Sequence, residues 1–335
     1  MKDLPDGREV YIPEWLPRIR SLYQQAPRAW IAKIDAYFQK NEFQQSPYEH
    51  SLYTKKKDGD IMIICLYMDD MIFTSNNPKM FEEFKKNMIK EFKMTDIGKM
   101  SYFLGVKVSQ SKRGIFISQK KYAKEILWKF NMSNCKPIAT PVKVRSLVGS
   151  LRYLTITRPD KIFAVGLVSR IVEEPRQEHF KVAKRILMYV QGSINEGLFY
   201  SQSVYQRLVG YTNNDYGGDL DKRKSTSGYM FSIGSAAFSW SSKKQSVVAL
   251  SSCEVEYIAA SAGACQAIWL RNLMKELQHE QEAPIEILID NKSTITLSKN
   301  PLAHGRSKHI ETRFHFIRHQ VTKKIVKMIY CKSED

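Results

Sequence analysis

Long apolar runs and a leader-like N-terminus are both missing from this sequence of 335 residues. No run of about 18 or more apolar residues occurs, and a membrane-spanning helix needs at least that length. The first seven residues, Met1–Gly7, lack the apolar core that secretory signals carry. We therefore expect an intracellular, non-secreted protein without membrane contacts. The choice among cytoplasm, nucleus and an organelle stays open.

Cysteine is scarce, with five residues at wide intervals and no CxxC motif. The odd number and the wide spacing do not suggest a disulfide framework. Free thiols in a reducing compartment are the simpler interpretation. A glycine-rich phosphate-binding loop of the P-loop type is also missing, so nucleotide binding by that route is not expected.

Acidic residues are few relative to basic ones, 34 against 52, which gives a formal net charge of +18. The excess is unevenly distributed along the chain. Residues 101–200 hold 18 basic and 6 acidic side chains, a net charge of +12, whereas residues 1–100 have a net charge of +1 and residues 201–335 of +5. Protein surfaces usually mix the two signs. A middle segment of one sign therefore indicates a polyanionic partner such as nucleic acid.

Hydrophobic patterning changes along the chain. Up to about residue 140, short apolar runs typical of strands alternate with amphipathic helices, such as the one through Phe84, Met88 and Phe92. Between residues 146 and 191 the pattern is helical nearly throughout. From residue 205 the predicted order is strand, strand, strand, helix, strand, helix, helix, strand. With a length suited to two domains, these patterns predict an α/β protein.

Two adjacent acids, Asp69 and Asp70, separate the apolar run 61–67 from a second one at 71–74. This arrangement predicts a β-hairpin with both carboxylates at its tip. Paired carboxylates suit Mg²⁺, and two such ions can clamp an in-line phosphoryl displacement. Aspartate is also common in ordinary polar turns. The spacing alone leaves these two interpretations equally open.

The box Tyr67-Met68-Asp69-Asp70 resembles the matching motif in the reverse transcriptase of copia-type retrotransposons, closest to plant elements. Six other stretches match the same family in family order: Gln25–Trp30, Tyr102–Gly105, Leu147–Leu154, Arg158–Asp160, Asp221–Tyr229 and Lys308–Ile310. The resemblance covers nearly the whole chain from about Leu22. It implies an α+β palm and the start of a thumb at residues 1–140, and a helical thumb or connection at 141–204. An α/β ribonuclease H-like domain with a mixed sheet, lacking its last helix, would follow at 205–335.

The resemblance also implies roles for single residues of the polymerase part. Asp69 and Asp70 would be catalytic metal ligands, with Mg²⁺ or Mn²⁺ as the cofactor. The nucleic-acid-binding residues would be Gln25, Arg28, Tyr67, Met68 and Gly105. The segment with a net charge of +12 falls where a thumb would hold a primer–template duplex or an RNA–DNA hybrid through its phosphates.

Two further acids match catalytic, metal-binding positions of the family's ribonuclease H-like domain. Glu256 falls in the first turns of a long predicted helix, and Asp290 ends a predicted strand. Taken singly, Glu256 also suits a favourable charge near a helix N-terminus, and Asp290 suits an N-cap. The sequence departs from the family motif at Asn213, which stands where the family has a metal-binding aspartate.

The resemblance predicts that both catalytic sites are incomplete. The family's polymerase has a further aspartate on an earlier strand, and the 21 residues before Leu22 do not resemble that strand. A fourth ribonuclease acid belongs beyond the position of Asp335. We therefore expect an RNA-directed DNA polymerase and ribonuclease H fragment whose two-metal phosphoryl transfer is impaired. Two alternatives stay open: a nucleic-acid-binding protein without catalysis, and a relic reading frame without function.

Overall fold

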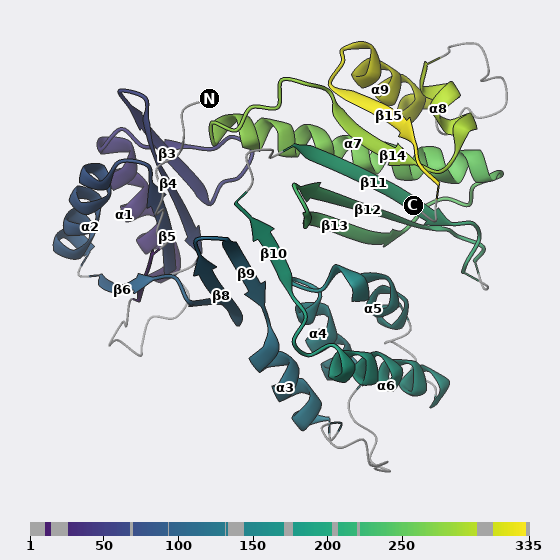
Figure 1. Ribbon diagram of the computed structural model, residues 1–335, viewed down its shortest axis with the longest axis horizontal. Helices are drawn as coiled ribbons and strands as arrows, with labels where there is room; N and C mark the ends of the chain where they lie inside the picture. Colours follow the sequence, from purple (N-terminus) through teal and green to yellow (C-terminus); the bar gives the residue numbers. More distant parts are fainter. Residues whose placement is uncertain are drawn as a thin grey trace. The chain divides into compact units, whose positions relative to one another are not determined.

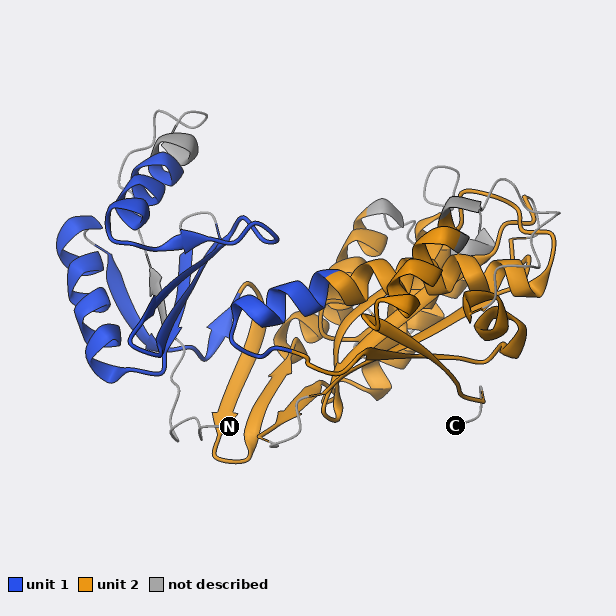
Figure 2. Ribbon diagram, turned by 90° about the horizontal axis from the view of Figure 1, so that it is seen from above, with its two compact units in different colours: residues 1–103, 269–280 blue, residues 104–268, 281–335 orange. Residues whose placement is uncertain are grey.

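The computed structural model describes residues 11–14, 26–67, 70–92, 94–130, 132, 144–170, 177–202, 207–219, 222–299 and 311–332. The chain divides into two compact units, which are treated separately below (Figure 2). Unit 1 comprises residues 1–103 and 269–280, and unit 2 comprises residues 104–268 and 281–335. None of the helices within the described ranges is long and apolar enough to cross a membrane.

Unit 1 is built on a six-stranded sheet with the strand order β2-β3-β4-β5-β1-β6 (Figure 1). Its elements are β1 (Tyr11–Glu14), α1 (Ala26–Lys40), β2 (Gln44–Gln45), β3 (Leu52–Lys57), β4 (Asp60–Tyr67), β5 (Asp70–Ser75), α2 (Pro78–Phe92), β6 (Thr95–Lys99) and β7 (Tyr102–Phe103). Strands β4 and β5 form the antiparallel hairpin that the sequence predicts, and Tyr67 pairs with Asp70 next to its tip. The predicted hairpin is therefore confirmed.

The core of unit 1 joins the sheet to helices α1 and α2. Phe84, Met88 and Phe92 recur every four residues along α2 and are all buried, as the amphipathic pattern predicts. They share one cluster with Phe38 of α1 and with buried side chains of β4 and β5, including Met62. This packing supports the β4–β5 hairpin from one side of the sheet.

Unit 2 contains a helical part and a five-stranded sheet. Its first elements are β8 (Val106–Ser111), β9 (Gly114–Ser118), α3 (Lys120–Lys129), α4 (Val144–Leu154), the 3₁₀ helix η1 (Pro159–Lys161), α5 (Ile162–Ser169), α6 (Gln177–Gly192) and β10 (Leu198–Ser201). Strands β8 and β10 both pair antiparallel with β9. Helices α3, α4, α5 and α6 share one buried apolar cluster, to which Leu127, Leu151, Val165 and Leu187 contribute.

The five-stranded sheet forms the rest of unit 2. Its elements are β11 (Leu208–Asp215), β12 (Thr226–Ile233), β13 (Ala236–Lys244), α7 (Ser252–Glu276), β14 (Ile285–Ile289), α8 (Lys292–Lys299), α9 (Glu311–Thr322) and β15 (Val326–Tyr330). Helix α7 is shared between the units, because its residues from Trp269 onward belong to unit 1. The strand order is β13-β12-β11-β14-β15. Strands β11, β12 and β13 are antiparallel, whereas β14 runs parallel to both β11 and β15. The element order and the α/β class with a mixed sheet are confirmed.

The helical part and the five-stranded sheet are directly bonded within unit 2. Hydrogen bonds between described residues join them: Trp240 Nε1 donates to Thr155 O (3.1 Å), Arg170 Nη2 to Thr226 Oγ1 (2.9 Å) and Tyr200 OH to Ala237 O (2.7 Å). Residues 104–202 thus belong to the same compact unit as the C-terminal sheet. The family-based boundaries at residues 140 and 204 stay a prediction.

Strand β11 and helix α7 approach each other unusually closely at Gly263. A Cβ atom on this residue would lie 2.6 Å from Thr212 Cγ2, a separation that no pair of carbon atoms tolerates. Gly263 is also in the interior of α7, where alanine would otherwise favour the helix by about 1 kcal/mol. Close packing therefore explains why residue 263 is a glycine. The same contact sets the distance between α7 and β11.

We expect Gly263→Ala to destabilise the protein by about 1–3 kcal/mol, because the added methyl group must push β11 away from α7. Thr212→Ala removes the opposing methyl group, so the double variant should recover most of the loss. Gly149→Ala is the control: it lies in α4 with no atom within 4 Å of the new Cβ, and it should stabilise slightly. Urea unfolding of the four variants measures the coupling energy, and simple additivity would contradict the close approach.

Candidate active site

The polymerase box lies at the β4–β5 hairpin of unit 1. Tyr67 ends β4, is 46% exposed, and contacts the ring of Phe103 edge-to-face with centroids 6.3 Å apart. Asp70 begins β5 and is partly buried. Met68 and Asp69 lie outside the described residues. The structure therefore places one of the two predicted polymerase ligands.

The other predicted contacts of the polymerase are distributed over both units. Gln25 lies outside the described residues, and Arg28 lies in the first turn of α1. Gly105 lies in unit 2 with a φ of +77°, and a Cβ atom there would lie 2.8 Å from Tyr153 OH. Tyr153 OH donates a hydrogen bond to Leu104 O. Both the backbone conformation and this contact require glycine at position 105.

Glu256 and Asp290 come together in unit 2, as the family match predicts for a common site. Glu256 lies near the start of α7 and is only 7% exposed, and Asp290 directly follows β14. Burial, the nearby Asp290 carboxylate and the hydrogen bond between the two groups raise the pKa of Glu256 to about 8. At neutral pH, Glu256 therefore mostly keeps its proton as long as no cation is bound beside it.

Strand β11 presents Asn214, and not Asn213, to this pair of acids. Side chains alternate along a strand, and Gly210 and Thr212 are buried on the face of β11 that meets α7. Asn214 shares that face, and its amide lowers the pKa of Glu256, which offsets part of the rise. Asn213 is exposed, and its Oδ1 accepts a hydrogen bond of 2.6 Å from the Asn214 backbone N–H. Family alignment points to position 213, whereas strand alternation points to 214.

Asp215, the one acidic residue of β11, makes its contacts at the β11–β12 connection and not with the Glu256–Asp290 pair. Its Oδ1 accepts a hydrogen bond from the backbone N–H of Thr226, its partner on β12. Its Oδ2 lies where a Cβ on Gly218 would come within 2.5 Å. These contacts hold the carboxylate at the connection between β11 and β12, so it is a structural group in this arrangement.

Two polar side-chain atoms of described residues at this site are buried without a hydrogen-bond partner. Among the described residues, Glu256 Oε2 and Asn214 Nδ2 are buried and neither has a partner with hydrogen-bond geometry. No cluster of three or more acidic, histidine or cysteine side chains within the described ranges could hold a metal ion. An amide supplies one neutral oxygen where a carboxylate would supply charge. These residues do not fit a pair of Mg²⁺ ions.

Helix α3 of unit 2 carries a basic face opposite its buried one. Ala123, Ile126 and Leu127 are buried in the helical cluster. The exposed charged residues of the helix are Lys120, Lys121, Lys124, Glu125 and Lys129, and Trp128 beside them is 78% exposed. Four ammonium groups against one carboxylate make this face suited to contacts with phosphates.

The raised pKa of Glu256 has a measurable effect on stability. Between about pH 4.5 and 8, folded Glu256 keeps a proton that the unfolded chain releases, so the free energy of unfolding falls as the pH rises, by up to roughly 4 kcal/mol. Glu256→Gln removes this dependence, and Glu125→Gln on the exposed side of α3 retains it. Urea unfolding at pH 5, 6.5 and 8 tests this; an unchanged pH profile in Glu256→Gln would show that the carboxyl is not buried as described.

The sequence and the fold can now be compared with those of known proteins. Residues 18–144 match the family model described as reverse transcriptase (RNA-dependent DNA polymerase). The chain is 36% identical over 346 residues to a retrovirus-related Pol polyprotein from transposon TNT 1-94 of Nicotiana tabacum, covering 94% of this chain and 26% of that protein. It is 33% identical over 344 residues to a Pol polyprotein from transposon RE1 of Arabidopsis thaliana, covering 96% and 24%. Among solved structures, LC11-RNase H1 in complex with an RNA/DNA hybrid gives a TM-score of 0.29 at 11% identity, covering 38% of this chain and 87% of that one.

The chain spans about a quarter of the length of the Pol polyproteins that it matches. The similarity to them runs through nearly all of its sequence, in agreement with the motifs that surround the polymerase box and the Glu256–Asp290 pair. The predicted family is thereby confirmed: the chain belongs to the copia-type retrotransposon Pol polyproteins.

Proposed function

We propose that this chain binds RNA–DNA hybrids and primer–template duplexes, and that its ribonuclease H-like site is catalytically impaired. The reverse transcriptase and ribonuclease H ancestry belongs to the family, whereas the substrate and the impairment are the proposal. The observation that carries it is the Asn214 amide beside Glu256 and Asp290, where a further carboxylate is needed.

Charge at the Glu256–Asp290 pair supports the impairment. Glu256 and Asp290 are the two carboxyl groups that meet at this site, and the Asn214 amide beside them adds a neutral oxygen where a carboxylate would add charge. Affinity for Mg²⁺ or Mn²⁺ depends on the number and charge of the oxygen ligands. We therefore expect the site to hold such cations weakly and to hydrolyse the RNA strand of a hybrid slowly, if at all.

For the polymerase part, we propose the roles that the family implies. Asp69 and Asp70 are metal ligands at the tip of the β4–β5 hairpin, next to Tyr67 and Met68. Gln25, Arg28 and Gly105 contact template, incoming nucleotide and primer. The partial burial of Asp70 next to the tip, and the exposure of Tyr67, support an accessible site at this hairpin.

The basic face of α3 supports duplex binding. Its lysines lie on the exposed side of a helix that is anchored by the buried cluster of unit 2, so their positive charges share one surface. Each phosphate that a lysine neutralises releases counterions, which makes the affinity strongly dependent on salt and independent of sequence.

Binding of a labelled RNA–DNA hybrid, followed by fluorescence anisotropy between 50 and 200 mM salt, tests the proposal. We expect tight, salt-sensitive binding, and no cleavage of the RNA strand in Mg²⁺ or Mn²⁺. Lys121→Gln with Lys124→Gln should reduce the salt slope by roughly 2. Lys86→Gln with Lys90→Gln, on the exposed side of α2, removes the same charge and should change the slope less.

Two outcomes would contradict this account. Metal-dependent cleavage that Glu256→Gln abolishes would show that the ribonuclease site is intact. A folded chain that does not bind the hybrid even at 50 mM salt would refute a retained nucleic-acid-binding function and favour a relic reading frame.

A further inference from the structure

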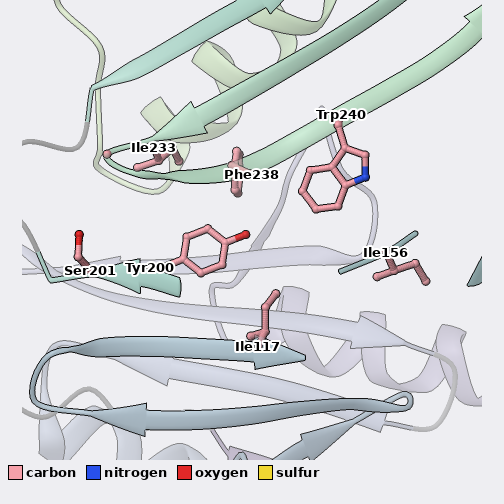
Figure 3. Close-up of a pocket in the computed structure, with 8 residues that line it drawn as sticks. Ile117, Ile156, Tyr200, Ser201, Ile233, Phe238 and Trp240 are labelled. Carbon is pink, nitrogen blue, oxygen red and sulfur yellow. The ribbon is translucent and has the colours of Figure 1, made fainter. Parts of the chain in front are cut away.

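A cavity of about 430 Å³ lies within unit 2, between the β9–β10 strands and the β12–β13 hairpin (Figure 3). Its side chains are mainly apolar and come from both parts: Ile233, Phe238 and Trp240 from the hairpin, and Ile117, Ile156 and Tyr200 from the facing part. In Figure 3, the Tyr200 ring lies between the hairpin and Ile117. The cavity is therefore lined by two separately packed parts of the unit and is partly open to solvent, since Ile156 is 50% and Phe238 39% exposed.

The polar atoms on its aromatic side chains are already paired within the protein. Tyr200 OH donates to Ala237 O at 2.7 Å, and Trp240 Nε1 donates to Thr155 O at 3.1 Å. None of the described residues that line the cavity is charged. A nucleotide or other anion entering it would lose hydration without gaining a charged partner, so the strongly basic character of the chain does not extend to this site.

We propose that this cavity is a binding site for a neutral aromatic molecule of two or three fused or linked rings. The volume falls within the range of about 300–1,000 Å³ that small-molecule sites usually have. Tyr200, Phe238 and Trp240 offer ring faces and edges against which a flat ligand packs. The lining includes neither Asp70, Glu256 nor Asp290, so the site is distinct from both candidate catalytic sites.

Binding in this cavity has a structural consequence. Because both the helical part and the five-stranded sheet contribute side chains, a ligand held between them adds contacts across their junction. A ligand that binds only the folded chain stabilises it in proportion to its concentration relative to its dissociation constant. Occupancy should therefore raise the melting temperature, whether or not nucleic acid is present.

N-phenyl-1-naphthylamine, a neutral dye that fluoresces more strongly in apolar surroundings, is a suitable probe for the full chain. We expect saturable one-to-one binding and a melting temperature that rises with dye concentration. Ser201→Trp and Ile156→Trp each place an indole into the cavity from a different side, and each should weaken binding roughly tenfold or more. Ser109→Trp is the matched control, on the exposed face of β8, and should leave the affinity unchanged.

Circular dichroism confirms folding of each variant, and if Ser201→Trp does not fold, Ile156→Trp carries the same test. Loss of binding in the cavity variants, with retention in the control, supports the site. Dye binding that does not saturate would overturn the proposal. So would equal affinities in the two cavity variants and the unaltered chain, or an equal loss in Ser109→Trp, because the dye would then bind elsewhere.

Discussion

The close approach of helix α7 to strand β11 is the constraint on which the candidate ribonuclease site depends. Gly263 allows Thr212 to contact the helix directly, and this contact fixes which face of β11 points to α7. Strand alternation then places Asn214 on the same face, beside Glu256. Parallel pairing of β11 with β14 brings Asp290 to the neighbouring strand end. Backbone packing thus determines which side chains meet, before any chemistry is considered.

The side chains that meet there produce an electrostatic mismatch. A site for two divalent cations requires several carboxylates that stay charged when buried. Here two carboxyl groups meet, and the third position is a neutral amide. The basic face of α3 lies in a separate part of unit 2 and depends only on the helical cluster. Our proposal therefore separates duplex binding from hydrolysis, because different residues would provide the two properties.

The sequence predicts those elements whose signal is local. Periodic burial along α2, the β4–β5 hairpin and the element order after residue 205 all follow from short-range patterns and are found in the structure. Strands β3 and β10 are not predicted, because β3 ends in three lysines and β10 pairs with β9 about eighty residues earlier. The position of Asn214 is also not predicted, since family alignment points to Asn213 and only the burial of Gly210 and Thr212 shows which face meets α7.

The most direct test of this account is the Mg²⁺-dependent hydrolysis of the RNA strand of an RNA–DNA hybrid by two single variants, Asn214→Asp and Asn213→Asp. The geometry predicts that Asn214→Asp raises the cleavage rate, because it adds a carboxylate on the face of β11 that meets Glu256. Asn213→Asp, on the exposed face, should leave the rate at the level of the unaltered chain. A higher cleavage rate in Asn213→Asp, with no increase in Asn214→Asp, would contradict the orientation of β11 on which the site is built.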